Sequence, residues 1–274
     1  MKKVEWALWK VFYLLVFVIG IKIMGDLAGA QLEENYAWFR ILFFALPGIL
    51  LIFHSILVLS PKRALLFVLL AAGTGSIMEY IGLRDGVFFG GHYVYASQLT
   101  LFTVPLEVIL YWAVFIYVGY SIVNSFLYWL KQKKPTFKAG NYISLVLAVL
   151  LDGLVVVALD FFMDPIAVRQ GNWKWLEGGS YFGIPIGNFI GWFVVVIIAT
   201  GIFRSVEYFF PKKEIQYDKS VFIIPVLEYG LLAVSFCFMA IQFKIHDLAF
   251  LGSLLMLPTV ILNLILYRRY KKGN

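Results

Sequence analysis

The sequence has few charged residues, a single cysteine and only three histidines. Charged residues make up 14% of the chain, whereas a typical soluble domain has roughly 25%. Because Cys237 stands alone, no disulfide can form within the chain, and cysteine usage does not indicate a redox compartment. His54, His92 and His246 lie on separate segments, and no HxxxH or CxxC spacing occurs, so we expect no metal site.

Signatures of several common enzyme classes are also missing. The sequence contains no GxxxxGK(S/T) phosphate loop, no dinucleotide-binding fingerprint and no GxSxG nucleophile elbow. These absences argue against kinase, nicotinamide-dependent and hydrolase functions. No linker or low-complexity stretch marks off a second domain, so the chain is predicted to form one transmembrane domain over residues 1–274.

Long apolar runs dominate what is present, since hydrophobic residues make up 62% of the chain and aromatic residues 18%. A membrane-spanning helix needs about 20 mostly apolar residues, and eight such runs occur, at 6–29, 38–59, 64–82, 104–129, 141–161, 185–203, 221–242 and 247–267. The predicted fold class is therefore all-α, a polytopic integral membrane helical bundle of about eight transmembrane helices. The first run, followed by Ala28-Gly29-Ala30, is also similar to a signal peptide, and its cleavage would leave seven spans.

The excess of positive charge indicates topology rather than nucleic-acid binding. The formal net charge is +7, and most basic residues fall on one side of the eight-span arrangement. By the positive-inside rule that side is cytoplasmic, so we predict a protein of the cell membrane with both termini in the cytoplasm. Loops 31–37, 83–103, 162–184 and 243–246 are predicted on the opposite side. The basic residues in or near that opposite side are Lys22, Arg40, Arg84, Arg169, Lys174 and Lys244.

Acids, indoles, glycines and amides gather in residues 160–192, between two apolar runs. Ionisable groups at membrane depth are costly, and their presence therefore suggests function. A similar hairpin of nearly equal length runs from Glu79 to Pro105, and it corresponds to the hairpin from Asp160 to Pro185. Because both hairpin loops are predicted on the same side of the membrane, they can face each other over one cavity.

Each of these residues also has a purely structural interpretation. The two acids at predicted span ends, Glu79 and Asp160, could be paired with Arg84 or with Arg169. Tyrosine and tryptophan are common anchors at membrane interfaces. Asp152 lies deeper and could line the same cavity as Asp160, eight residues further along one helix. Two other candidates for buried acids are Glu107 and Glu228.

Acids and aromatic rings around an apolar cavity suit acid–base chemistry on a lipophilic hydrocarbon. Protonation of an alkene makes a carbocation, which aromatic faces stabilise by cation–π attraction. A carboxylic acid kept neutral by an apolar site can donate the proton near neutral pH.

Several short motifs resemble one known family. They are EYIG at 79–82, GHYVY at 91–95, VP at 104–105 with Trp112, DFFMDP at 160–165, GNWKW at 171–175 and YFGIPIGNFIGW at 181–192. These motifs are similar to those of the carotenoid biosynthesis family that contains the CruF-type carotenoid 1,2-hydratases and bisanhydrobacterioruberin hydratases. The resemblance extends over a core of residues 64–205. It implies addition of water across the terminal C1,C2 double bond of a linear carotenoid, a reaction that needs no redox cofactor, so we expect no cofactor.

The resemblance and the residue inventory together give a site hypothesis. Either Asp160 or Glu79 is expected to donate the proton, and either Asp164 or Asn188 to orient water. The residues expected to bind substrate are His92, Tyr93, Tyr95, Trp173, Trp175, Tyr181 and Trp192. The expected partners are a lipophilic linear carotenoid or related polyisoprenoid and membrane lipid, and no nucleic acid. Two alternatives stay open: another isoprenoid end-group enzyme such as a cyclase, and a non-catalytic lipid-binding or transport protein.

Overall fold

The computed structural model describes residues 2–30, 32–133, 142–211 and 217–273. Within these residues, eight helices are long and apolar enough to cross a membrane, as predicted. They are α1 (Lys2–Leu27), α3 (Ala37–Leu59), α4 (Pro61–Asp85), α5 (Leu106–Lys133), α6 (Tyr142–Gln170), α7 (Ile186–Phe209), α8 (Ile223–Gln242) and α9 (His246–Gly273). Two short helical pieces are α2 (Leu32–Asn35) and the 3₁₀ turn η1 (Lys219–Phe222). The protein is an all-α integral membrane protein.

Two helices extend further than the predicted spans. As a result, Asp160 and Glu79 lie further from the helix ends than predicted. The predicted fifth span ends at 161, but α6 continues through Pro165 to Gln170. It continues because Phe162, Ile166 and Ala167 are buried against neighbouring helices, and packed neighbours make proline tolerable inside a membrane helix. Glu79 likewise lies inside α4, which reaches Asp85. The interpretation of Glu79 and Asp160 as span-end residues was therefore wrong.

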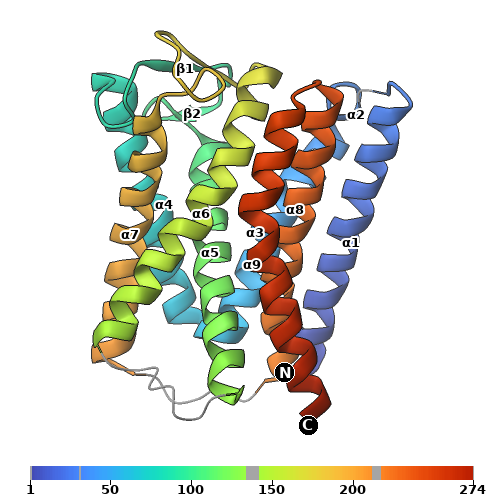
Figure 1. Ribbon diagram of the computed structural model, residues 1–274, viewed down its shortest axis with the longest axis vertical. Helices are drawn as coiled ribbons and strands as arrows, with labels where there is room; N and C mark the ends of the chain where they lie inside the picture. The colour runs from blue at the N-terminus through green and yellow to red at the C-terminus, as the bar shows by residue number, and fades with distance from the viewer. Residues whose placement is uncertain (1, 31, 134–141, 212–216, 274) are drawn as a thin grey trace.

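The helices run side by side, and both termini lie at one end of the bundle (Figure 1). The short strands and α2 lie at the opposite end, called here the strand end (Figure 1). This arrangement agrees with the predicted grouping of the loops, although its orientation in the membrane stays a prediction. Lys134, Lys138, Lys212, Lys213 and the predicted start of a span at 141 lie outside the described residues.

Helix α5 forms the centre of the bundle. It packs against α3, α4, α6, α7, α8 and α9. Its largest side chains are almost completely buried: Trp112, Tyr117, Tyr120 and Trp129 are each 1% exposed. Large apolar side chains on the outer helices are exposed instead, as expected of surfaces that face lipid. The central position of α5 places Trp112 between the two predicted hairpins.

The two hairpin loops meet through a small antiparallel sheet. Strand β1 (Tyr93–Tyr95) pairs with β4 (Trp173–Trp175) in the register Tyr93↔Trp175 and Tyr95↔Trp173. A second two-stranded sheet, β2 (Thr100–Leu101) with β3 (Val104–Pro105), leads into α5. The facing hairpins predicted from the sequence are thus joined by backbone hydrogen bonds.

Two glycines allow the first hairpin to touch the start of α7. A Cβ on Gly90 would lie 2.9 Å from the Cα of Gly187, and a Cβ on Gly187 would lie 2.7 Å from the Cα of Gly90. Gly90 also has a φ of +81°, in the left-handed region that favours glycine. An aromatic residue at 90 would separate these backbones, so glycine at both positions fixes how the hairpin sits on α7.

Candidate active site

Glu79 is the centre of a buried hydrogen-bonded cluster near the strand end of α4. Its Oε2 accepts hydrogen bonds from the hydroxyls of Tyr93 at 2.7 Å and Tyr95 at 3.0 Å. Its Oε1 accepts one from Nε1 of Trp112 at 3.1 Å. Glu79 is 3% exposed. All three donors are neutral groups, so the carboxyl is held by aromatic side chains and not by an arginine.

The position of Trp112 depends on a glycine of α4. Gly75 lies four residues before Glu79, on the same face of the helix. A Cβ on Gly75 would lie 2.2 Å from Cγ of Trp112. The indole therefore fits against the bare backbone of Gly75 while its N–H reaches Glu79. Trp112 was one of the motif residues, but its role as a partner of Glu79 was not predicted.

Asp160, Asp164 and Asn188 form a second buried cluster between α6 and α7. Nδ2 of Asn188 donates to Oδ2 of Asp160 at 2.9 Å and to Oδ2 of Asp164 at 2.8 Å. Oδ1 of Asp164 also accepts from Nε1 of Trp173 at 2.5 Å. Oδ1 of Asp160 is buried and has no hydrogen-bond partner. One carboxyl of the pair is thus held at both oxygens, and the other at one only.

Helix geometry explains why these groups converge. Asp160 and Asp164 are four residues apart on α6 and so lie on one face, one turn apart. Asn188 lies in the first turn of α7, which packs along α6. Trp192, four residues later, points to the same side as Asn188 and packs against Trp112 with ring centroids 4.1 Å apart and ring planes tilted by 31°. This contact brings the second cluster next to the partner of Glu79.

The β1–β4 sheet links the two clusters at the strand end. The rings of Tyr95 and Trp173, cross-strand partners, lie 5.7 Å apart in an edge-to-face arrangement. The rings of Tyr93 and Trp175 lie 4.7 Å apart. Because Tyr93 and Tyr95 bind Glu79 while Trp173 binds Asp164, the register of two short strands sets the relative positions of the acids.

The two tyrosines act as hydrogen-bond donors throughout the physiological pH range. Burial, followed by the charge of nearby Glu79, raises the pKa of Tyr93 and of Tyr95 well above the ordinary value for a phenol. Burial also raises the pKa of Tyr181 to about 12, with a smaller contribution from the charge of Asp160. Phenols that keep their protons can support Glu79 without adding charge to the site.

Ion pairs lie elsewhere in the described part of the chain. Arg84 lies 3.7 Å from Asp85 and not beside Glu79. Arg169 is exposed at the end of α6. Within the residues that the structure describes, no ion pair involves Glu79, Asp160 or Asp164. The structural interpretation in which an arginine neutralises these acids therefore does not describe this protein.

The deeper acid Asp152, considered as a possible neighbour of Asp160 in one cavity, is paired with an arginine instead. Its two carboxyl oxygens accept from Nε and Nη2 of Arg204, both at 2.6 Å. Such a bidentate pair is a strong anchor between α6 and α7, so Asp152 is not free to act with Asp160.

Of the other candidates, Glu107 is half-buried, and Glu228 is buried with Oε1 lacking a hydrogen-bond partner.

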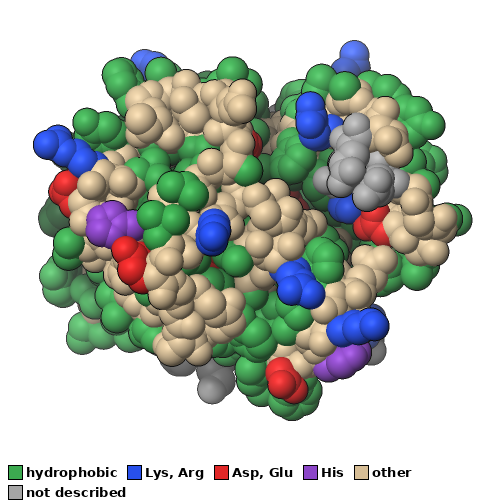
Figure 2. Space-filling model, turned by 90° about the horizontal axis from the view of Figure 1, so that it is seen from above, with side chains coloured by type: hydrophobic (Ala, Val, Ile, Leu, Met, Phe, Trp, Pro, Cys, Tyr) green, Lys and Arg blue, Asp and Glu red, His purple; other side chains and the backbone are tan. Residues whose placement is uncertain are grey.

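Two of the predicted substrate-binding residues lie at the margin of the acid clusters. His92 is exposed, and its Nδ1 lies 2.8 Å from Oε1 of Glu177, while its backbone N–H donates to Oε2 at 2.9 Å. Tyr181 donates to the backbone carbonyl of Phe161 at 3.1 Å. Seen from the strand end, the surface carries only scattered charged side chains among apolar ones (Figure 2). His92 therefore belongs to the loop surface, and the structure gathers the remaining predicted residues around the acids.

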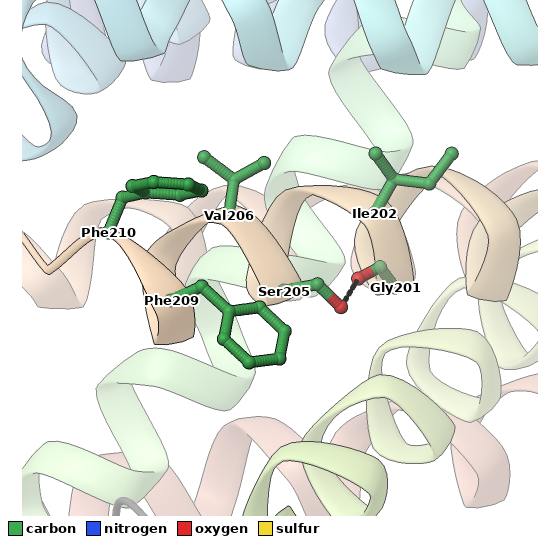
Figure 3. A pocket seen from close by; sticks show the side chains of 6 residues that line it. All are labelled: Gly201, Ile202, Ser205, Val206, Phe209 and Phe210. Atoms are coloured by element: carbon green, nitrogen blue, oxygen red, sulfur yellow. Dashed lines mark hydrogen bonds between the residues drawn. The ribbon is translucent and has the colours of Figure 1, made fainter.

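A surface hollow at the far end of α7 is separate from the acid clusters. A hollow of about 410 Å³ lies at the opposite end of α7, lined by Gly201, Ile202, Ser205, Val206, Phe209 and Phe210 (Figure 3). Its one drawn hydrogen bond runs from Ser205 Oγ to the carbonyl of Gly201 within the helix, at 2.7 Å. Among the described residues, no group of three or more histidines, cysteines and acids could hold a metal ion.

The sequence was compared with known protein families. Residues 38–259 match the family described as carotenoid biosynthesis protein. The chain belongs to this family. The matched region includes both acid clusters and the β1–β4 sheet, as well as the 64–205 stretch that contains the motifs. Comparisons with curated proteins and with solved structures gave no match. The protein is thus a carotenoid-related membrane protein with a buried set of carboxyls and aromatic rings near one end of its bundle.

Proposed function

We propose that this protein adds water to the terminal C1,C2 double bond of a linear carotenoid. Membership of a carotenoid biosynthesis family supports the substrate class. The reaction type is supported by the buried acids, which lie among aromatic rings and have no basic partner among the described residues. Hydration of an alkene needs a proton donor, a site that stabilises a cation and an acceptor for a proton of water. The site contains candidates for each role.

The observation that carries the proposal is the unequal bonding of Asp160 and Asp164. Asp164 accepts hydrogen bonds at both oxygens, from Trp173 and from Asn188, which suits a carboxylate. Asp160 accepts at Oδ2 only, and its buried Oδ1 has no partner. A buried oxygen of that kind suits a protonated carboxyl, since an unpaired buried charge is costly. Asp160 is therefore the proposed donor, and its proton is transferred to C2 of the double bond.

Proton transfer leaves a tertiary cation at C1, and aromatic faces are the groups available to stabilise it. Trp173 and Tyr95 lie beside Asp164, and Trp175 with Tyr93 continues the same wall. The indoles of Trp112 and Trp192, with centroids 4.1 Å apart, are further rings near the acids, since Trp112 donates to Glu79. Each cation–π contact is worth roughly 0.5–2 kcal/mol, so two or three such contacts stabilise the cation appreciably.

Water then attacks C1 and forms the new carbon–oxygen bond. Asp164, as the carboxylate, accepts the proton that the attacking water loses, and transfer of a proton back to Asp160 restores the starting state. The net change is one alkene plus one water to one tertiary alcohol, with no electron transfer. Asn188 is a positioning residue in this scheme, because its amide N–H groups are already bonded to both acids.

Conversion of a linear carotenoid in cells tests the proposal. The protein is expressed in a host that accumulates a linear carotenoid, and the pigments are analysed by mass. A product heavier by one water supports hydration, and its absence with Asp160→Asn identifies the protein as its source. A product of unchanged mass with a ring end group would instead support the cyclase alternative. Unchanged pigment bound to the purified protein would support a binding protein.

A further inference from the structure

A row of aromatic rings leads away from the acids toward α3. It starts at the neighbouring indoles of Trp192 and Trp112, whose planes are tilted by 31°, and continues to Phe115, whose ring centroid is 6.2 Å from that of Trp192. Phe115 lies 5.1 Å from Tyr111 on the same helix. Tyr111 in turn lies 5.9 Å from Phe44 of α3, and Phe44 lies 5.4 Å from Phe43. We call these six residues the ring row.

The ring row is level with the acids rather than spread along the bundle. At about 1.5 Å per residue, Trp192 lies about 9 Å from the start of α7 and Phe44 about 10 Å from the start of α3. Tyr111 lies about 8 Å from the start of α5, and Glu79 about 9 Å from the end of α4. All four of these helix ends are at the strand end (Figure 1). The row therefore runs sideways, across the bundle.

The ring row is buried at the end near the acids and half-buried at the other end. Trp112, Phe115 and Trp192 are 1%, 5% and 9% exposed. Tyr111, Phe44 and Phe43 are half-buried. Their neighbours on the same two helices face outward, with Leu110 37% and Ile41 67% exposed. One end of the row is thus beside the acids, and the other reaches the lipid-facing surface where α3 packs on α5.

We infer that the ring row binds the apolar polyene chain of the substrate and guides it from the lipid to the acids. This inference rests on the proposed function, since it places the reacting end of the same molecule at Asp160. A conjugated chain is flat and has no polar group, so its best partners are aromatic faces and edges. A molecule of that kind is dissolved in the bilayer and reaches a membrane enzyme from the side.

A second group of rings near Asp160 does not fit this role. Phe161 and Phe189 are stacked with centroids 3.9 Å apart and planes 10° apart, and Tyr181 closes their edge at 5.3 Å from Phe189. Phe161 follows directly after Asp160, and Phe189 follows directly after Asn188. Each of these two rings therefore points about 100° away from the preceding acid-cluster residue on its helix. The pair therefore holds α6 to α7 on the side away from the acids.

Paired substrates of different length test the inference. Phe44→Leu and Tyr111→Leu, alone and combined, keep apolar side chains and remove ring faces near the lipid end of the row. Phe53→Leu is the matched control, because Phe53 lies nine residues further along α3 and is 38% exposed. Hydration is measured in membranes with a linear carotenoid and with a short acyclic terpene that has the same terminal alkene. Retention of the linear carotenoid is measured separately in the Asp160→Asn background.

The double variant is expected to raise the carotenoid concentration needed for half-maximal rate on the order of tenfold. The double variant should hydrate the short terpene at an unchanged rate, and it should retain less linear carotenoid in the Asp160→Asn background. Phe53→Leu should leave the hydration of both substrates unchanged. Equal loss with long and short substrates, or no loss with either, would overturn the ring row as a binding site. If the unsubstituted protein hydrates neither substrate, the proposed function fails, and the retention measurement still decides the ring row.

Discussion

Tyr95 and Trp173 face each other across the β1–β4 sheet with ring centroids 5.7 Å apart, and each donates a hydrogen bond to a different buried acid. The tyrosine binds Glu79 of α4, and the tryptophan binds Asp164 of α6. One cross-strand pair thus couples two helices that carry the ionisable groups. A slip of one strand by one residue would turn its member of the pair to the other face of the sheet and release the acid that it binds.

Substitution of the two buried acids should separate a proton donor from a structural carboxyl. Asp160→Asn preserves size and removes the proton, so hydration should fall by about 10²–10⁴-fold or more, while the protein still accumulates. Glu79→Gln instead replaces one acceptor oxygen by an amide N–H, so at least one of the hydroxyl and indole donors around position 79 loses its acceptor. An unsatisfied buried donor costs about 1–3 kcal/mol of stability. Glu79→Gln should lower the thermal unfolding temperature more than Asp160→Asn does. Hydration per folded molecule and unfolding temperature are measured on both variants. These roles would be refuted if Glu79→Gln lost more hydration and Asp160→Asn lost more thermal stability.

Trp173 should contribute to catalysis through both its ring and its N–H. Trp173→Phe keeps a ring opposite Tyr95 and removes the donor to Asp164, whereas Trp173→Leu removes both. Loss of one cation–π contact corresponds to about 0.5–2 kcal/mol, or about a 2- to 30-fold lower rate. Trp173→Leu should therefore be slower than Trp173→Phe by a factor in that range. Equal rates for the two variants would show that the face of Trp173 does not act on the cation.

The sequence was sufficient for the spans and for the identity of the acids, but not for their partners. Apolar runs are local signals, so the eight helices could be read directly, except where α6 continues through Pro165. Asp160 and Asp164 were found because acids are rare in such runs. Their bonding depends on contacts between distant segments: Asn188 from α7, Trp173 from β4, and for Glu79 the indole of Trp112. No local pattern specifies the strand register or the pairing of Asp152 with Arg204.

The loop contact between His92 and Glu177 should make the strand end sensitive to acid. The hydrogen bonds from the side chain and backbone of His92 lower the pKa of Glu177 below its ordinary value. Because the pKa of Glu177 is lower in the folded protein than in the unfolded chain, the contact stabilises the fold at pH values above the unfolded pKa. This stabilisation is lost as the pH falls through the pKa of the folded state. Hydration should therefore decline reversibly at acid pH, and Glu177→Gln should remove that part of the decline. An identical acid profile for Glu177→Gln would show that this contact does not hold the loops.

Membrane orientation can be tested at both ends of the bundle with single cysteines. In a Cys237→Ser background, Ser180→Cys introduces a thiol of nearly the same size as the hydroxyl at an exposed position in the loop after β4. Gln132→Cys is the matched site, exposed near the end of α5 at the opposite end of the bundle. The positive-inside rule places the basic-rich end in the cytoplasm. A membrane-impermeant thiol reagent added to intact cells should therefore modify position 180 at once and position 132 only after permeabilisation. The reverse pattern would put the acid clusters near the cytoplasmic surface, and the predicted topology would have to be inverted.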